Sequence, residues 1–351
     1  MFLNKLNINL LGAFMLLLIF ASCKKADHNA PRILNINYPA AYIVNGTGNN
    51  ISVVKLADNT VSETISLNGA TYPHHIYLNP AKSKLAVAIT STDLSGGHSG
   101  GHGNTVSGQK IQIIDVVTGS IEKEIGVSKL PHNAAFSPGG AELWVPQGDT
   151  LNGTVLVFNT TDWALLKTIN VGRMPSELTF SFDGSMVFVA NTKDGTVSMI
   201  DPNSKVVMQT IPVGMDPVGA WPASNGKMYV DNEASQTISE IDVMTGAVSA
   251  TFSLGFKPGY AAYSTHHSEV WVTDATNGKV VFFEKIAGTW TPAGNLATGA
   301  DAHAIAFSAN GEKAYISNQG ANTVTLIDVV NHTVSATINV GTKPNGIALK
   351  Q

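Results

Sequence analysis

The chain has 351 residues, enough for one large all-β domain or two ordinary domains. Charged residues make up 13%, well below the roughly 25% of typical soluble domains, and the abundance of Gly, Thr, Val, Ile, Ser and Asn favours strands and turns over helices. The formal net charge is -4, and no run of Lys or Arg forms a stripe. A nucleic-acid partner is therefore disfavoured, because binding to a phosphate backbone depends on clustered positive charge.

Residues 1–22 have the pattern of a secretory signal peptide. Lys5 precedes an apolar run of 11 residues from Leu10 to Phe20, which is shorter than the roughly 20 residues that a membrane-spanning helix needs. The following segment, FASCKK, resembles the lipobox of bacterial lipoproteins. That resemblance implies cleavage before Cys23, the only cysteine of the chain, and acylation of its thiol. Plain secretion is the alternative.

Residues 23–38 then form the lipidated cysteine and a tether, and residues 39–351 form the folded domain. Removal of Lys5 with the signal makes the mature net charge -5. Lys24 and Lys25 follow the cysteine, with no acidic residue directly behind it to signal retention at the inner membrane. We predict a lipid-anchored protein of the cell envelope, at the outer membrane and facing either the periplasm or the surface.

From Tyr42 onward the chain repeats itself. Two clear copies are MVFVANTKDGTVSMIDPNSKVVMQTIPVGMDP from Met186 and KMYVDNEASQTISEIDVMTGAVSATFSLGFKP from Lys227. Each copy has an alternating run, a short turn, a second run ending in Ile-Asp, another turn, and a third run before Gly-x-x-Pro. One mostly aromatic position recurs at steps of 44, 58, 44, 41, 42 and 44 residues: Tyr42, Ala86, Trp144, Phe188, Tyr229, Trp271 and Tyr315.

Four short strands in each unit of about 40–45 residues is the spacing of a β-propeller blade. Seven units predict an all-β, seven-bladed β-propeller with four antiparallel strands per blade. An aromatic residue at one register of each blade indicates packing between blades and not a binding cage. The aspartates that end the third strand of a unit are expected to form turns: Asp115, Asp201, Asp242 and Asp328.

The segments FVANTKDGTVSMID, YISNQGANTVTLID, TINVGTKPNGIAL and AFSANGEKAYIS resemble the YVTN-type β-propeller repeat family, which includes YncE-like proteins. The resemblance covers the chain from about residue 40 to the C-terminus, with the second and sixth units the least regular. It implies a seven-bladed propeller that is often exported, and it implies no single activity, because one fold supports many functions.

Six inner strands precede their second strands along the chain, so the first blade lacks one. The segment NGIALK, from Asn345 to Lys350, follows the last outer strand and is predicted to complete the first blade, which closes the ring and leaves no open edge there. The alternative is that RILNI, from Arg32 to Ile36, fills this place.

The residues that open the inner strands should lie at the mouth of the central channel. In blade order from the first they are Asn345, His74, His132, Ser176, Val218, Gly259 and His303. The three histidines and Asn345 occupy four successive blades, so polarity is predicted on one side of the mouth. Glu177 and Asp301 are expected close by. His75 should point into the blade packing by strand alternation and is therefore interpreted as structural, and His28, His266, His267 and His332 are given no role.

The second blade contains an insertion of about 16 residues, 93–108, which includes the stretch SGGHSGGHGNTVSG. It lies between the second and third strands of its blade, so it leaves the same face on which His74 opens. This placement brings His98 and His102 within reach of the mouth. The alternative is a solvated glycine-rich excursion without function.

Imidazoles converging without a thiolate suit copper, zinc or nickel. We therefore predict a metal site of His74, His132, His303, His98 and His102, with Asn345, Ser176, Glu177 and Asp301 contacting a metal or small ligand. Each histidine alone can equally be a hydrogen-bonding residue of the fold.

The sequence has no Gly-x-Ser-x-Gly, His-Glu-x-x-His or phosphate-loop motif. The main functional prediction is a lipid-anchored protein that captures a metal ion or small ligand, one variant being delivery of a nutrient to an outer-membrane transporter. A protein-interaction scaffold of the envelope is the alternative. A metal-dependent lactonase that uses Glu177 and DNA binding are weaker alternatives.

Overall fold

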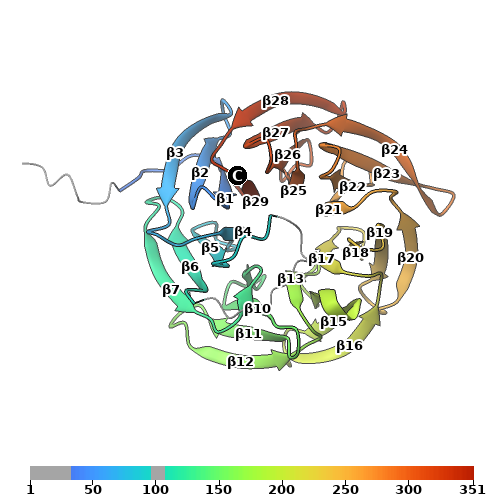
Figure 1. Ribbon diagram of the computed structural model, residues 1–351, viewed down its shortest axis with the longest axis horizontal. Coiled ribbons are helices and arrows are strands. Elements are labelled where there is room, and N and C mark those ends of the chain that lie inside the picture. The colour runs from blue at the N-terminus through green and yellow to red at the C-terminus, as the bar shows by residue number, and fades with distance from the viewer. Residues whose placement is uncertain (1–32, 96–106) are drawn as a thin grey trace, which may run out of the picture. The chain divides into compact units, whose positions relative to one another are not determined.

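Seven antiparallel sheets arranged around a central axis make up the folded part of the chain (Figure 1). This computed structural model describes residues 33–95 and 107–351. The predicted signal peptide, Cys23, His28 and the first part of the tether lie outside the described residues, as do His98 and His102. The prediction of an all-β, seven-bladed propeller is confirmed.

Each blade is numbered by its place in the chain, and its strands are given from the channel outward. Blade 1 consists of β29 (Pro344–Lys350), β1 (Ala40–Asn45), β2 (Asn50–Lys55) and β3 (Thr60–Ser66). Blade 2 consists of β4 (Pro73–Leu78), β5 (Lys84–Ile89), β6 (Lys110–Asp115) and β7 (Ile121–Gly126). Blade 3 has a divided inner strand, so its members are β8 (Leu130–Pro131), β9 (Ala135–Phe136), β10 (Glu142–Gly148), β11 (Thr154–Asn159) and β12 (Leu165–Asn170).

The remaining four blades follow the same plan. Blade 4 consists of β13 (Pro175–Phe180), β14 (Val187–Asn191), β15 (Thr196–Asp201) and β16 (Val206–Pro212), with the short 3-10 helix η1 (Thr192–Asp194) between β14 and β15. Blade 5 consists of β17 (Pro217–Pro222), β18 (Lys227–Asn232), β19 (Thr237–Asp242) and β20 (Val248–Ser253). Blade 6 consists of β21 (Pro258–Ser264), β22 (Glu269–Asp274), β23 (Lys279–Ile286) and β24 (Thr289–Ala297). Blade 7 consists of β25 (Ala302–Phe307), β26 (Lys313–Asn318), β27 (Thr323–Asp328) and β28 (Thr333–Asn339).

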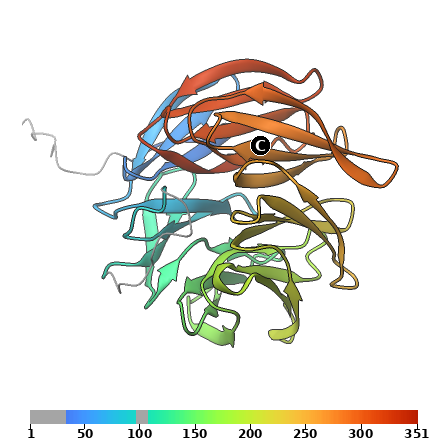
Figure 2. The same ribbon diagram turned by 45° about the vertical axis from the view of Figure 1, so that its right-hand side comes forward.

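The antiparallel order gives the propeller two distinct faces. Inner strands begin on the face that also carries the connections between second and third strands, and we call this the mouth face. The turns that follow the inner strands and the third strands lie on the opposite face, which we call the far face. The long hairpin of β23 and β24 projects beyond the ring at the right of Figure 2.

The C-terminal strand closes the ring as predicted. β29 pairs with β1 in antiparallel register, with Ala40 opposite Lys350 and Tyr42 opposite Ala348. The alternative segment lies elsewhere: the amides of Leu34 and Ile36 donate to the carbonyls of Thr118 and Val117, at 3.1 and 2.8 Å. Residues 33–36 therefore lie against the far-face turn of blade 2.

The repeated asparagine at the end of four second strands has a structural role. In each case its Nδ2 donates to a hydroxyl seven residues later, at 2.9–3.0 Å, as in Asn318 to Thr325 and Asn191 to Ser198. Since these asparagines are fully buried, the bond satisfies a donor that would otherwise be costly to bury. It also fixes the connection between the second and third strands.

The blade anchors form the core. The six aromatic anchors and Ala86 are at most 1% exposed, which confirms their predicted packing role. The predicted turn-forming aspartates also behave as expected: Asp115, for example, accepts hydrogen bonds from the amides of Val117 and Thr118.

A β-bulge interrupts the start of the inner strand in every blade. Pro73 pairs with Ile89 and Ile76 pairs with Val87, so three steps along β4 match two steps along β5. The other six inner strands also gain one residue over their neighbours at this point. A bulge breaks the alternation of side chains, so the residue after each strand-opening residue need not point into the blade.

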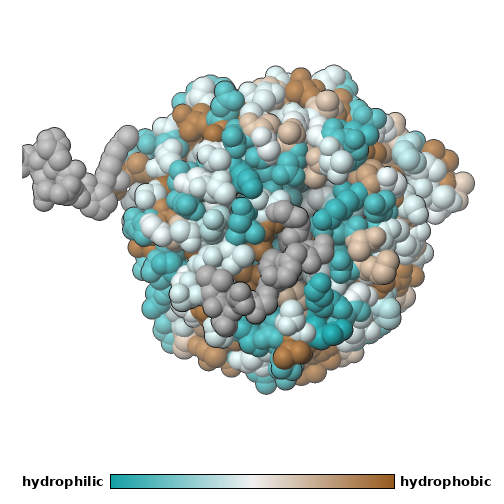
Figure 3. Space-filling model, viewed as in Figure 1, coloured by the Kyte–Doolittle hydropathy of each residue, from teal (hydrophilic) through white to brown (hydrophobic). Residues whose placement is uncertain are grey.

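One face of the propeller is shown in Figure 3. Hydrophilic residues surround much of its centre, and apolar residues lie singly, mostly toward the rim.

Removal of residues 344–351 should weaken the whole propeller. Blade 1 would lose its inner strand, the backbone hydrogen bonds to β1 and the apolar contacts of the partly buried Ile347 and Leu349. We expect a lower thermal midpoint and a broader transition in circular dichroism. Deletion of exposed Gln351 alone is the control, and an unchanged midpoint in the longer truncation would contradict ring closure by β29.

Candidate functional site

A buried group of three histidines and one glutamate lies inside the channel. His74 and His75 come from β4, His132 follows β8, and Glu177 comes from β13, so three successive blades contribute. Each residue offers one ligand atom, and these atoms all lie within 4.8 Å of one another. We call His74, His75, His132 and Glu177 the channel cluster.

Glu177 is the centre of the cluster contacts. Its Oε1 lies 2.9 Å from Nδ1 of His132 and 3.0 Å from Nε2 of His75. The ring centroid of His74 lies 4.3 Å from the ring centroid of His132 and 4.4 Å from that of His75. All four residues are at most 4% exposed, so solvent screens these contacts little.

Neighbouring groups hold the cluster in one orientation. His74 Nδ1 lies 3.3 Å from the carbonyl oxygen of His132, which leaves Nε2 of His74 as the acceptor nitrogen when Nδ1 donates. The Tyr77 hydroxyl donates to Glu177 Oε2 at 3.2 Å, which leaves Oε1 toward the histidines. Asn133 exchanges hydrogen bonds with the backbone of Leu178, at 2.7 and 3.2 Å, and so ties blade 3 to blade 4 beside the cluster.

Burial dominates the electrostatics of the channel. It raises the pKa of the Glu177 carboxyl well above its usual range, the hydrogen bond from Tyr77 opposes this, and the charge of Asp231 adds to it. Burial likewise raises the pKa of Asp231. A cation beside Glu177 would be favourable, because an isolated buried carboxylate is costly.

The prediction that His75 points into the blade packing was wrong, because its side chain lies in the channel cluster. The bulge between Pro73 and Ile76 turns His75 to the same group as His74, where strand alternation had placed it in the blade. One repeated position in the sequence could have indicated this placement. The second residue after the proline that opens or ends the first part of the inner strand is polar in blades 2, 3 and 4, where it is His75, Asn133 and Glu177. Asp231 and Tyr77 were not singled out, since neither belongs to this repeated position.

The other predicted mouth residues lie near the cluster but outside it. The His303 ring centroid is 5.9 Å from that of His75 and 6.3 Å from that of His74. Asn345 and His74 line the same small cavity. Ser176 shares a 2.7 Å hydrogen bond with the Thr192 hydroxyl. Asp301 lies with His303 along a neighbouring cavity.

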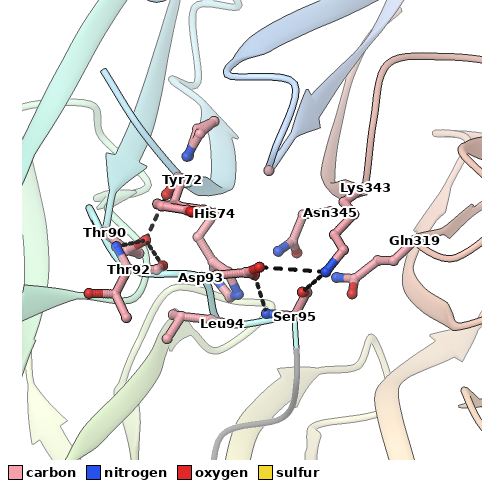
Figure 4. Close-up of a pocket in the computed structure, with 12 residues that line it drawn as sticks. Tyr72, His74, Thr90, Thr92, Asp93, Leu94, Ser95, Gln319, Lys343 and Asn345 are labelled. Atoms are coloured by element: carbon pink, nitrogen blue, oxygen red, sulfur yellow. Dashed lines mark hydrogen bonds and ion pairs between the residues drawn. The ribbon is translucent and has the colours of Figure 1, made fainter. Parts of the chain in front are cut away.

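The first residues of the blade 2 insertion lie across the mouth. Lys343, from the connection between β28 and β29, contacts Asp93 at 3.5 Å and donates to the Ser95 hydroxyl (Figure 4). Leu94 packs against Leu130 and Met174 on the other side of the channel. The insertion therefore emerges next to His74 as predicted, while ligation by His98 and His102 stays a prediction because both lie outside the described residues.

Two cavities lie in this region, one beside His303 and one beside His75. One, of about 310 Å³, is lined by polar groups that include Glu233, Lys257, Asp301 and His303. The other, of about 170 Å³, is lined by His75, Tyr77 and Tyr260 together with aliphatic residues of β25 and β29. A group bound at the cluster thus has space beside His75.

Three further histidines gather on the far face. His332 Nε2 lies 2.9 Å from a carboxylate oxygen of Glu269, and the His267 ring stacks on that of His332 with centroids 4.6 Å apart. His266 lies beside His267. This group is on the opposite face from the mouth, as the sequence predicts.

Residues 35–281, about seven-tenths of the chain, match the family model described as the Choice-of-anchor I domain. The chain belongs to this family. The match indicates a cell-surface or envelope protein, and resemblance of the chain to YVTN-type repeats stays a prediction from its motifs. None of the curated proteins compared with this Choice-of-anchor I chain matches it significantly.

Solved propellers resemble the Choice-of-anchor I chain in fold. The periplasmic gluconolactonase of Pseudomonas aeruginosa is 17% identical, with a TM-score of 0.69 over 89% of this chain and 99% of that one. Hydrazine synthase of Kuenenia stuttgartiensis is 20% identical, with a TM-score of 0.63 over 79% of this chain and 89% of that one. Identities this low show the fold alone. No helix in the described part of the chain is long and apolar enough to cross a membrane.

The buried carboxyl of Asp231 should make folding stability depend on pH. Its Oδ1 accepts from the Gly219 amide and Trp221 Nε1, while Oδ2 has no hydrogen-bond partner among the described residues. Because the folded pKa of Asp231 is raised, the protonated form contributes stability below the unfolded pKa, and this contribution is lost as pH rises through the folded pKa.

We therefore expect Asp231→Asn to lose less stability than the wild type between pH 5 and pH 8. The free energy of unfolding of the wild type should therefore fall more steeply with rising pH than that of the variant, because asparagine does not titrate. Denaturant unfolding in the presence of a chelator measures it. Parallel pH profiles for the two proteins would contradict the assignment.

Proposed function

We propose that this envelope protein binds one transition-metal ion, copper, zinc or nickel, in the channel cluster. The observation that carries the proposal is the convergence of three imidazoles and one carboxylate, all buried, with their ligand atoms within 4.8 Å of one another. Nitrogen-rich sets of this kind suit copper, zinc and nickel. The only cysteine is Cys23, so no thiolate takes part.

The surroundings of the cluster also fit a metal. Ligating histidines normally donate their second ring nitrogen to an oxygen, and His74 Nδ1 has such a partner in the His132 carbonyl. Tyr77 supports Glu177 in the same way. A divalent cation would compensate the buried Glu177 carboxylate, and the imidazole nitrogens would give up the protons that they share with this oxygen.

The cavities support a role in capture and not only in stability. The polar cavity of about 310 Å³ beside His303 is large enough for a small ligand. We propose capture of a metal ion or of a small metal-associated ligand, by a protein anchored through Cys23. Delivery to an envelope transporter or another envelope protein is a further part of this proposal, and no basic stripe supports DNA as the partner.

Metal analysis of the purified full chain tests the site. We expect near-stoichiometric copper, zinc or nickel after incubation and gel filtration, and loss of the metal in the His74→Gln, His132→Gln double variant. His303→Gln is the matched control: it lines the mouth but lies outside the four-residue cluster, so it should keep its metal.

Thermal unfolding shows whether a variant that has lost its metal is still folded. A ligand that binds the native state raises its stability, so zinc should raise the midpoint of the wild type and of His303→Gln but not that of the double variant. Absence of any metal above background in the folded wild type would refute the proposal. If His303→Gln lost as much metal as the double variant, the metal site would not be the four-residue channel cluster.

Metal-assisted hydrolysis is a second candidate, favoured by one observation: a buried carboxyl beside three histidines and a cavity. A lactonase of this kind should lose turnover in Glu177→Gln. Inertness of the metal-loaded wild type toward sugar lactones and esters would exclude it and leave metal capture untouched.

A further inference from the structure

Exposed apolar side chains are distributed unequally between the two faces of the propeller. The described residues expose fourteen large apolar side chains. Five lie at far-face turns or beside one: Ile33, Phe182, Met244, Ile286 and Val330. Seven lie within the first three residues of outer strands, next to the same face: Val61, Leu165, Leu166, Val206, Met208, Val248 and Val334. Only Leu151 and Met215 belong to mouth-face connections.

The far-face residues stand at the tips of separate turns. Met244 is 93% exposed in the turn between β19 and β20, and Phe182 is 69% exposed in the turn between β13 and β14. Val330 lies in the turn between β27 and β28. These side chains lie on separate turns and are exposed, so no described residue covers them fully. Twelve of the fourteen exposed apolar side chains thus lie at or beside the far face, where contact with an apolar phase would remove them from water.

The chain enters the propeller on this same face. Leu34 bonds to the far-face turn of blade 2, so the first described residues, from Ile33, lie at the far face. Cys23 precedes Ile33 by ten positions. At no more than about 3.6 Å per residue, a lipid on Cys23 holds the far face within roughly 36 Å of a membrane.

The charges of the far face do not indicate electrostatic attraction to a membrane. The far-face turns carry both signs, with Lys55, Lys82 and Lys205 among Asp58, Asp183 and Asp242. Within residues 33–95 and 107–351, the far-face turns form no basic patch for anionic lipid. Contact should therefore depend on apolar insertion and occur on neutral lipid.

We propose that the far face is the membrane-contacting surface of this protein, with Phe182, Met244 and Val330 inserted into the lipid interface. The mouth face and the channel cluster then point away from the membrane, toward the aqueous compartment. This inference depends on the proposed anchor only for its reach, and it does not depend on whether the channel binds a metal.

Depth-dependent fluorescence quenching tests the orientation. The full chain is reconstituted into phosphatidylcholine vesicles that contain brominated lipid, with an environment-sensitive probe on Met244→Cys or, as the matched control, on Met215→Cys. Both positions are exposed methionines, at 93% and 64%, on opposite faces. We expect bromolipid to quench the Met244 probe and not the Met215 probe.

Each other outcome overturns the proposal. Quenching of the Met215 probe alone would reverse the orientation, equal quenching would place the disc on its edge, and quenching of neither would leave the far face for a protein partner. The chain without an added cysteine is the labelling control. Labelling of that control would show a free thiol on Cys23 and so contradict the lipid anchor separately.

Discussion

The β-bulge at the start of each inner strand is the constraint on which the candidate site depends. A regular strand would send alternate side chains to opposite sides, and only His74, His132 and the other strand-opening residues would reach the channel. The extra residue brings the next side chain there as well, so His75 and Glu177 join the group. Three blades then supply four ligand atoms within 4.8 Å.

Much of the fold could be predicted from the repeat. Seven anchors at near-constant spacing set the number of blades, and the unmatched final segment identified the strand that closes the ring, because each unit needs four strands. The entry of residues 33–36 could not be predicted, since their hydrogen bonds to Val117 and Thr118 are made by the backbone. Backbone pairing of this kind has no signature in residue type.

The site could be predicted only in part. Connectivity placed His74, His132 and His303 at one mouth and the blade 2 insertion above them, because strand direction alternates along the chain. It failed for His75, where alternation breaks at the bulge, and it treated His303 as equal to the others although its ring lies about 6 Å from its neighbours. Asp231 escaped notice because burial, not sequence pattern, makes its carboxyl unusual.

The two faces differ in the residues that they carry. The mouth face leads to the buried histidine and carboxyl groups, while the far face receives residues 33–36 and has most of the exposed apolar residues at or beside it. The central claim concerns the first of these. Anomalous diffraction at the absorption edge of zinc, copper or nickel, from crystals of the metal-loaded protein, tests it most directly. The account predicts one peak between His74, His75, His132 and Glu177, and a peak only at the far-face histidines, or none, would contradict it.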